Sequence, residues 1–316
     1  MDLELSAEQL ELDRALATIM ARQAGPDRAR ELGDKMDRAL LDALADSGFL
    51  DTVQGAGPIE GVLVTERAAE GVACAPVAAR VLVGPLAGID DLPPAVGLAD
   101  RRVEALVRYG TECEAFLVLD GDGDAGAVLA SADDVDVQPV AASFGPGYAL
   151  VTVRVGEELG PGVGARLRGA WQVAIAVEAA ATMRTAVLNT VQYVTQRHQF
   201  GRPIGSFQAV QHKLAQAYVG AEASQWLARR AAWYHDDEFL TASAAAYACE
   251  SADLVYSNTH QVSGAIGVTN EYGLVLWTLR LLALRSALGG KRMHARRVAA
   301  ARRRTDLSEV PSPIHA

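Results

Sequence analysis

The stretch Gln196–His212, with the sequence QRHQFGRPIGSFQAVQH, decides how the carboxy-terminal half of the chain folds. Alanine-rich apolar segments with helical spacing lie on both sides of it, whereas Gly201, Pro203 and Gly205 interrupt that spacing within it. We therefore expect a tight connection between two long helices, the second of which begins at Ser206.

The side chains of this connection suit an anionic ligand. Arg197 carries a planar guanidinium that can donate two parallel hydrogen bonds to a phosphate. Gln199 and Gln208 add neutral donors, and Phe200 and Phe207 add flat apolar surface. A helix pair packed by its aromatic side chains, with Arg197 in solvent, explains the same spacing, so spacing alone leaves both interpretations open.

Working outward, periodicity divides the chain into three regions. Residues 1–95 show helical spacing, with a capping box that opens at Ser6. Residues 96–160 contain short β-branched runs between Gly and Asp clusters, which predict strands, and residues 161–316 return to helical spacing with a last helix from Tyr272. The long helices are expected at 171–197, 206–236 and 240–262. The expected fold class is mainly α with a small β region: an amino-terminal helical domain, a reduced β-rich middle domain and a carboxy-terminal four-helix bundle.

Composition excludes several kinds of function. The 39 acidic against 29 basic side chains give a net charge of -10, which disfavours nucleic acid as a partner. The three cysteines have no metal-ligand spacing, so we expect a reduced compartment and no metal site. The chain starts without a signal-like segment, and its most apolar late stretch, 274–288, contains arginines, so neither export nor a membrane span is expected. These features predict a cytoplasmic protein.

The connection also resembles a known motif. It matches the R-x-x-F-G-x-x-I-x-x-F-Q segment of the acyl-CoA dehydrogenase family, which binds the adenine-side pyrophosphate of an FAD held mainly by the neighbouring subunit. The resemblance implies the same cofactor-binding role for Arg197, Gln199, Phe200, Ile204, Phe207 and Gln208.

A second resemblance lies downstream. Residues 261–272 are similar to the Q-x-x-G-G-x-G-x-x-x-E-Y segment with which the family reaches the adenosine end of FAD across the assembly. Gln261 and Gly264 are the transferable positions, whereas Ala265 replaces the second glycine and narrows the backbone approach. Residues 41–50 look like part of the family's first helical domain. The resemblance covers most of the chain and is strongest from Leu167 to the end.

The departures from the family pattern concern catalysis. Family members remove the α-proton of an acyl-CoA with a glutamate in a Y-E-G-T segment, and here Leu288 stands at that position. Other members place the base early in the first long helix of the last domain, where this chain has Trp171 and Gln172. Glu178, two turns further on, is a weak substitute. The segments that hold the flavin ring in the family are also missing from the short middle region.

The resemblance implies a non-catalytic subunit of an α2β2 FAD-dependent acyl-CoA dehydrogenase, which shares FAD with a homologous catalytic subunit. That partner would bind most of the acyl-CoA, and the resemblance extends to enzymes that act on CoA thioesters of steroid side chains and rings. Two alternatives stay open: a self-sufficient homo-oligomeric dehydrogenase with a relocated base such as Glu178, and a flavin-free structural or regulatory homologue.

Overall fold

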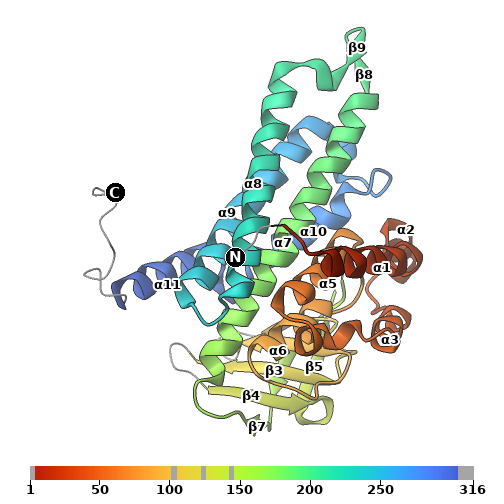
Figure 1. Cartoon of the computed structure of the whole chain (residues 1–316). Coiled ribbons are helices and arrows are strands. Elements are labelled where there is room, and N and C mark those ends of the chain that lie inside the picture. The colour runs from red at the N-terminus through yellow and green to blue at the C-terminus, as the bar shows by residue number, and fades with distance from the viewer. Residues whose placement is uncertain (1–3, 101–104, 122–125, 142–145, 305–316) are drawn as a thin grey trace, which may run out of the picture.

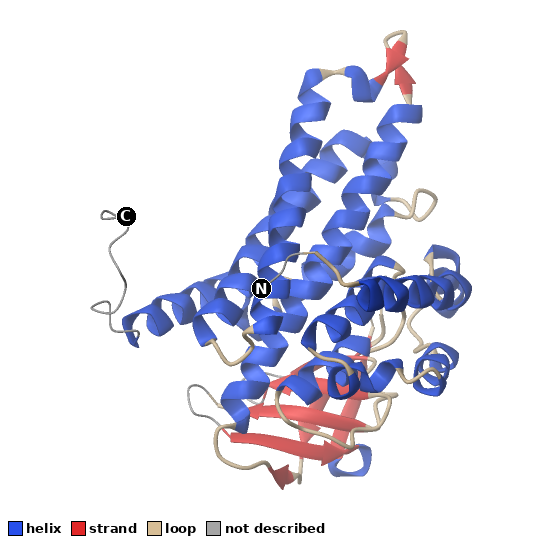
Figure 2. Cartoon of the chain, viewed as in Figure 1, coloured by secondary structure: helices blue, strands red, loops and turns tan. Residues whose placement is uncertain are grey.

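The computed structural model describes residues 4–100, 105–121, 126–141 and 146–304. Short helices come first, two small sheets follow, and long helices complete the chain, so the expected mainly α fold with a small β region is confirmed. The long helices form an elongated bundle, and the sheets lie at one of its ends (Figures 1 and 2).

The amino-terminal region is helical, as the periodicity predicts. Its first helix begins with the capping box: Gln9 N–H donates to Ser6 Oγ at 3.2 Å, and Ser6 N–H donates to Gln9 Oε1 at 2.9 Å. The helices of this region are α1 (Ala7–Gln23), α2 (Pro26–Leu32), α3 (Arg38–Asp46), α4 (Thr52–Gly55), α5 (Pro58–Glu70) and α6 (Gly84–Leu86).

The strands form two small sheets. In the first sheet, ordered β1-β3-β4-β7, β1 and β3 are parallel and the other pairs are antiparallel. The second sheet, ordered β2-β6-β5, is antiparallel throughout. The strands are β1 (Val96–Asp100), β2 (Ala105–Arg108), β3 (Ala115–Asp120), β4 (Gly126–Ser131), β5 (Val135–Val140), β6 (Tyr148–Val153) and β7 (Glu157–Glu158).

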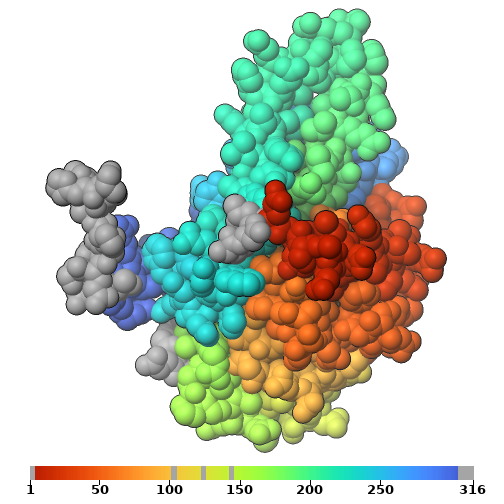
Figure 3. Space-filling view, viewed as in Figure 1, coloured from red at the N-terminus to blue at the C-terminus, as the bar shows by residue number. Residues whose placement is uncertain are grey.

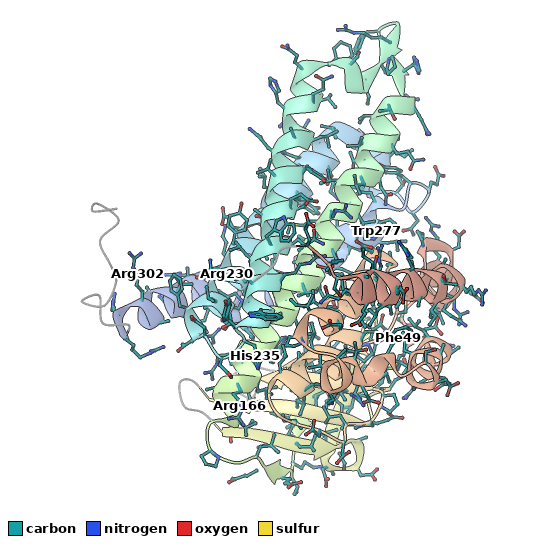
Figure 4. All side chains as sticks on the ribbon, in the orientation of Figure 1. Phe49, Arg166, Arg230, His235, Trp277 and Arg302 are labelled. Atoms are coloured by element: carbon teal, nitrogen blue, oxygen red, sulfur yellow. The ribbon has the colours of Figure 1, made fainter. Side chains whose placement is uncertain are left out.

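The carboxy-terminal bundle is built on one very long helix, α7 (Val163–Gln196), which packs against α8 (Gln208–Trp233), α9 (Glu238–Ser263) and α10 (Leu274–Leu284). Buried alanines on these helices, among them Ala217, Ala221 and Ala248, let the backbones approach closely. Trp277 on α10 joins the bundle to the amino-terminal region, because its Nε1–H donates to the Glu70 carbonyl at 3.0 Å (Figure 4).

Two expected boundaries were wrong. The second long helix begins at Gln208 rather than at Ser206, because Ser206 belongs to a 3-10 turn and its hydroxyl donates to the Pro203 carbonyl at 2.7 Å. The last helix from Tyr272 is two helices, α10 and α11 (Gly290–Arg304), because a turn at Ala287–Gly289 separates them. No helix in the described ranges is long and apolar enough to cross a membrane.

Candidate functional site

The predicted connection is a short β-hairpin at the free end of the bundle, formed by β8 (His198–Gln199) and β9 (Arg202–Pro203). Its two turn residues, Phe200 and Gly201, both have positive φ, 54° and 78°. This conformation suits glycine but costs about 1 kcal/mol for a residue with a Cβ. Phe200 is therefore held in an unfavourable conformation at the tip.

The aromatic side chains of the hairpin are ordered but not buried. Phe200 is 89% exposed, and its ring meets the Phe207 ring edge to face, with 6.1 Å between centroids. Arg202 stacks on the other ring, with its guanidinium carbon 4.1 Å from the Phe207 centroid. Arg202 gave no signal in the sequence, because the motif leaves that position variable.

The predicted polar residues face solvent. Arg197, Gln199 and Gln208 are exposed, and Arg197 has no ion pair among the described residues. Ile204 is half-buried and opens the 3-10 turn that leads into α8. An exposed guanidinium and two exposed amides beside a flat ring are groups that fit the phosphate and adenosine part of a dinucleotide.

The second predicted segment reaches the same end of the bundle. Gln261 is exposed near the end of α9, and the exposed Gly264 ends that helix with a φ of 66°. Helices α8 and α9 are antiparallel, and Asn258 Nδ2 donates to the Lys213 carbonyl at 3.0 Å, so the end of α9 lies beside the beginning of α8. A Cβ added at Gly264 would meet no atom within 4 Å, which leaves room for a ligand there. The structure thus brings both predicted segments to one end.

A cavity of about 680 Å³ lies at the other end of α7, next to the sheets. Leu288, at the family's base position, is one of its walls and is 5% exposed. The lining is mainly apolar and includes Trp171, and its polar residues are Asp100, Arg108, Tyr148, Glu178 and Ser286. This pocket therefore holds an aliphatic side chain where the family pattern has a proton acceptor.

Glu178 lies on the cavity wall as an ion-pair partner. Arg108 Nη2 donates to both of its oxygens, at 3.0 and 2.7 Å. Burial lowers the pKa of Arg108, but the charge and hydrogen bond of Glu178 raise that pKa by more, so the guanidinium stays charged. Both oxygens of this carboxylate therefore contact the Arg108 guanidinium rather than the open cavity alone.

The turn that carries Leu288 is supported by His294, which the sequence analysis did not single out. Its Nε2–H donates to the Ala287 carbonyl at 3.2 Å, and its Nδ1 accepts from Gln172 Nε2 at 3.1 Å. Burial, and secondarily the charge of Arg297, lower the pKa of His294 to about 4, so the ring is neutral. Gln172, at the alternative base position, thus has a structural role.

The two sites are far apart along α7. Glu178 lies at the cavity, and Arg197 follows 19 residues later at the hairpin. At 1.5 Å per helical residue, this separation is about 28 Å. The hairpin end projects from the rest of the molecule, as Figure 3 shows. Among the described residues, no cluster of His, Cys, Asp or Glu could hold a metal ion.

The chain has the fold of the acyl-CoA dehydrogenases, with a helical bundle, small sheets and an exposed hairpin. Residues 172–302 match the family model for the acyl-CoA dehydrogenase carboxy-terminal domain. The carboxy-terminal region, residues 172–302, therefore belongs to the acyl-CoA dehydrogenase family, a family of flavoproteins that oxidise CH–CH bonds.

Proteins with similar sequences differ in how much of their own length this chain matches. Acyl-CoA dehydrogenase FadE34 of Mycobacterium tuberculosis is 34% identical over 61% of this chain, but the match spans only 29% of that protein. FadE27 of the same organism is 28% identical over 99% of this chain and 100% of its own length.

Similar solved structures support the fold. The ChsE4-ChsE5 complex of Mycobacterium tuberculosis has a chain with a TM-score of 0.80, 24% identity and coverage of 99% of this chain and 100% of its own. A steroid acyl-CoA dehydrogenase variant, Tcur3481-Tcur3483, also has a TM-score of 0.80, with 22% identity over 94% of this chain and 98% of its own.

Proposed function

We propose that this chain is the non-catalytic subunit of a heteromeric FAD-dependent acyl-CoA dehydrogenase. The observation that carries the proposal is the separation of its two sites. The cavity offers Leu288 in place of a base, and the residues suited to FAD are exposed about 28 Å away along α7. Residues exposed so far from their own chain's cavity can serve a cofactor that a neighbouring chain holds.

In this assembly, the hairpin and the end of α9 hold the adenine side of the partner's FAD. Arg197 binds a phosphate, Gln199 and Gln208 donate hydrogen bonds, and Phe200 and Phe207 cover the cofactor, with Ile204 fixing the turn below them. Gln261 and Gly264 approach the adenosine end. When bound, FAD supplies the acceptor for the hydride removed from the acyl group.

The partner in this proposal is a homologous chain that carries the catalytic glutamate and binds most of the acyl-CoA. Two of the similar solved structures name pairs of chains, ChsE4-ChsE5 and Tcur3481-Tcur3483, which supports a two-chain assembly here. The second is named a steroid acyl-CoA dehydrogenase, which supports a steroid-derived CoA thioester as the substrate.

A second candidate is a self-sufficient dehydrogenase that uses Glu178 as its base. The position of Glu178 on the cavity wall favours it. The contacts of both carboxylate oxygens with Arg108 argue against it, because a base must be free to accept the substrate's proton.

The proposal is tested by FAD retention in the assembly that this chain forms with a coexpressed homologous dehydrogenase chain of the same organism. Arg197→Ala should lower the FAD retained per assembly, because it removes the charged phosphate donor. Arg292→Ala is the matched control, since Arg292 is also exposed and has no ion pair among the described residues. Unchanged FAD content in Arg197→Ala would support a flavin-free structural role instead.

A further inference from the structure

The cavity at the sheet end of α7 has the size and the lining of a small-molecule site. Its volume of about 680 Å³ falls within the range of roughly 300–1,000 Å³ that ligand pockets occupy. Its lining includes Leu106, which is 53% exposed, as well as the buried Leu284 and Leu288, so the cavity reaches from the surface into the core. A molecule that enters it can therefore bury most of its apolar area against the inner wall.

The inner wall is fixed before a ligand binds. The turn that carries Leu288 is held twice, because Arg297 Nη1 donates to the Leu288 carbonyl at 3.2 Å and His294 Nε2–H donates to the Ala287 carbonyl at 3.2 Å. A wall that is already ordered lowers the entropy cost of binding. Met293 also lines the cavity, and its unbranched side chain can adapt to the shape of a ligand.

Three polar groups of the cavity wall lie together. Arg108 and Tyr148 are opposite each other on β2 and β6, and Arg108 donates to both oxygens of Glu178. The Tyr148 hydroxyl has no hydrogen bond to any described residue. Burial raises the pKa of Tyr148, so the hydroxyl stays protonated and can both donate and accept. It is therefore the group to which an oxygen of a ligand can bind.

The charges of the wall disfavour an anionic ligand. Arg108 is the only cationic side chain among the described lining residues, and it is already paired with Glu178. Asp100 adds a second carboxylate to the lining. An anionic head group would lose its water here without gaining a free cationic partner, which costs more than burying a neutral hydroxyl or carbonyl group.

We propose that this cavity binds a neutral amphiphile, an alcohol or ketone whose oxygen meets the Tyr148 hydroxyl and whose apolar body lies against Leu288. The ligand stays chemically unchanged, because Leu288 cannot accept a proton. This inference goes beyond the proposed function, since it concerns a ligand that this chain holds in its own cavity and not the FAD or the acyl-CoA of the partner.

The test is equilibrium binding of the neutral fluorescent probe 1-aminoanthracene to the full chain purified alone. The probe should bind at one saturable site, and 1-decanol should displace it. Decanoate has the same number of carbons with an anionic head group, and it should displace the probe at least about 30-fold more weakly.

Two variants with matched controls test the location of the site. Tyr148→Phe removes only the hydroxyl and should weaken decanol binding by about 3- to 10-fold, whereas Tyr247→Phe, at an exposed position of α9, should leave it unchanged. Ala283→Trp fills the cavity from its half-buried wall and should abolish probe binding. Ala299→Trp should leave probe binding unchanged, because Ala299 is exposed on α11 and is not part of the cavity lining.

Three results would overturn the inference. Equal displacement by decanol and decanoate would show that the site accepts an anion. Undiminished decanol binding in Tyr148→Phe would remove the assigned contact, whether or not Ala283→Trp folds, and a lack of saturable probe binding would remove the site. The FAD measurements are independent of these results, so an assembly without FAD would sink the proposed function and leave the ligand site standing.

Discussion

The ion pair between Glu66 and Arg229 should contribute strongly to the free energy of unfolding. Glu66 lies on α5, is 4% exposed, and accepts hydrogen bonds from Arg229 and from Gln225, whose Nε2 is 3.1 Å away. This contact joins the amino-terminal region to the bundle. In Arg229→Leu, the buried carboxylate keeps only the amide of Gln225 as a partner.

The expected cost follows from that burial. Removing one member of a buried pair costs about 3–5 kcal/mol, because the remaining charge is desolvated without compensation. At about 2–4 °C per kcal/mol for a chain of a few hundred residues, the melting temperature should fall by roughly 10 °C.

Scanning calorimetry of the purified chain would measure the change. The double variant Glu66→Met, Arg229→Leu should regain most of the loss, since no buried charge remains. Lys291→Leu breaks the more exposed contact with Glu250 and should leave the melting temperature near that of the wild type. A drop of less than about 2 °C in Arg229→Leu, or a double variant as unstable as the single one, would refute this reasoning.

Three further predictions concern the cavity and the hairpin. Glu178→Gln should leave the turnover rate of the assembly within about twofold of the wild-type rate in steady-state kinetics. Loss of a catalytic base would instead lower the rate by about 100-fold or more. His294 has a pKa of about 4 in the folded chain and about 6.5 when unfolded, so the unfolded chain binds more protons between these values. The contribution of neutral His294 to the unfolding free energy is therefore fully present above pH 6.5 and is lost as the pH falls toward 4. Across that window, the difference in unfolding free energy between wild type and His294→Gln should change by about 3 kcal/mol. Urea titrations that give the same difference at every pH would contradict this. Phe200→Gly should leave the isolated chain at least as stable as the wild type in thermal melts, because the ring is 89% exposed and the backbone has positive φ. The same change should lower FAD retention in the assembly. A destabilised chain would show instead that the ring has a structural role.

Local pattern predicted the helices and the connection but not the details of the hairpin. Gly201 and Pro203 indicate a break between helices, and the break is there. A hairpin turn with positive φ at both central residues is typical of Asn or Asp before Gly, so Phe200 gave no such signal. Ser206 was expected to begin α8, but its hydroxyl bonds the Pro203 carbonyl instead.

The cavity could not be predicted, because its residues come together over long sequence separations. Arg108 and Glu178 are 70 positions apart, and no periodicity links a strand to a helix at that range. The break at Leu288 was missed for a different reason. Leu288 has a φ of 52° in a turn that His294 contacts from seven residues further on, whereas the preceding segment has unbroken helical spacing.

The central claim, that this chain completes the FAD site of a homologous partner, is tested most directly by counting bound FAD. FAD would be measured on the chain purified alone and on its complex with a coexpressed homologous dehydrogenase chain of the same organism. The account predicts no FAD on the isolated chain and one FAD for each pair of unlike chains. One FAD per chain in an assembly of this chain alone would contradict it.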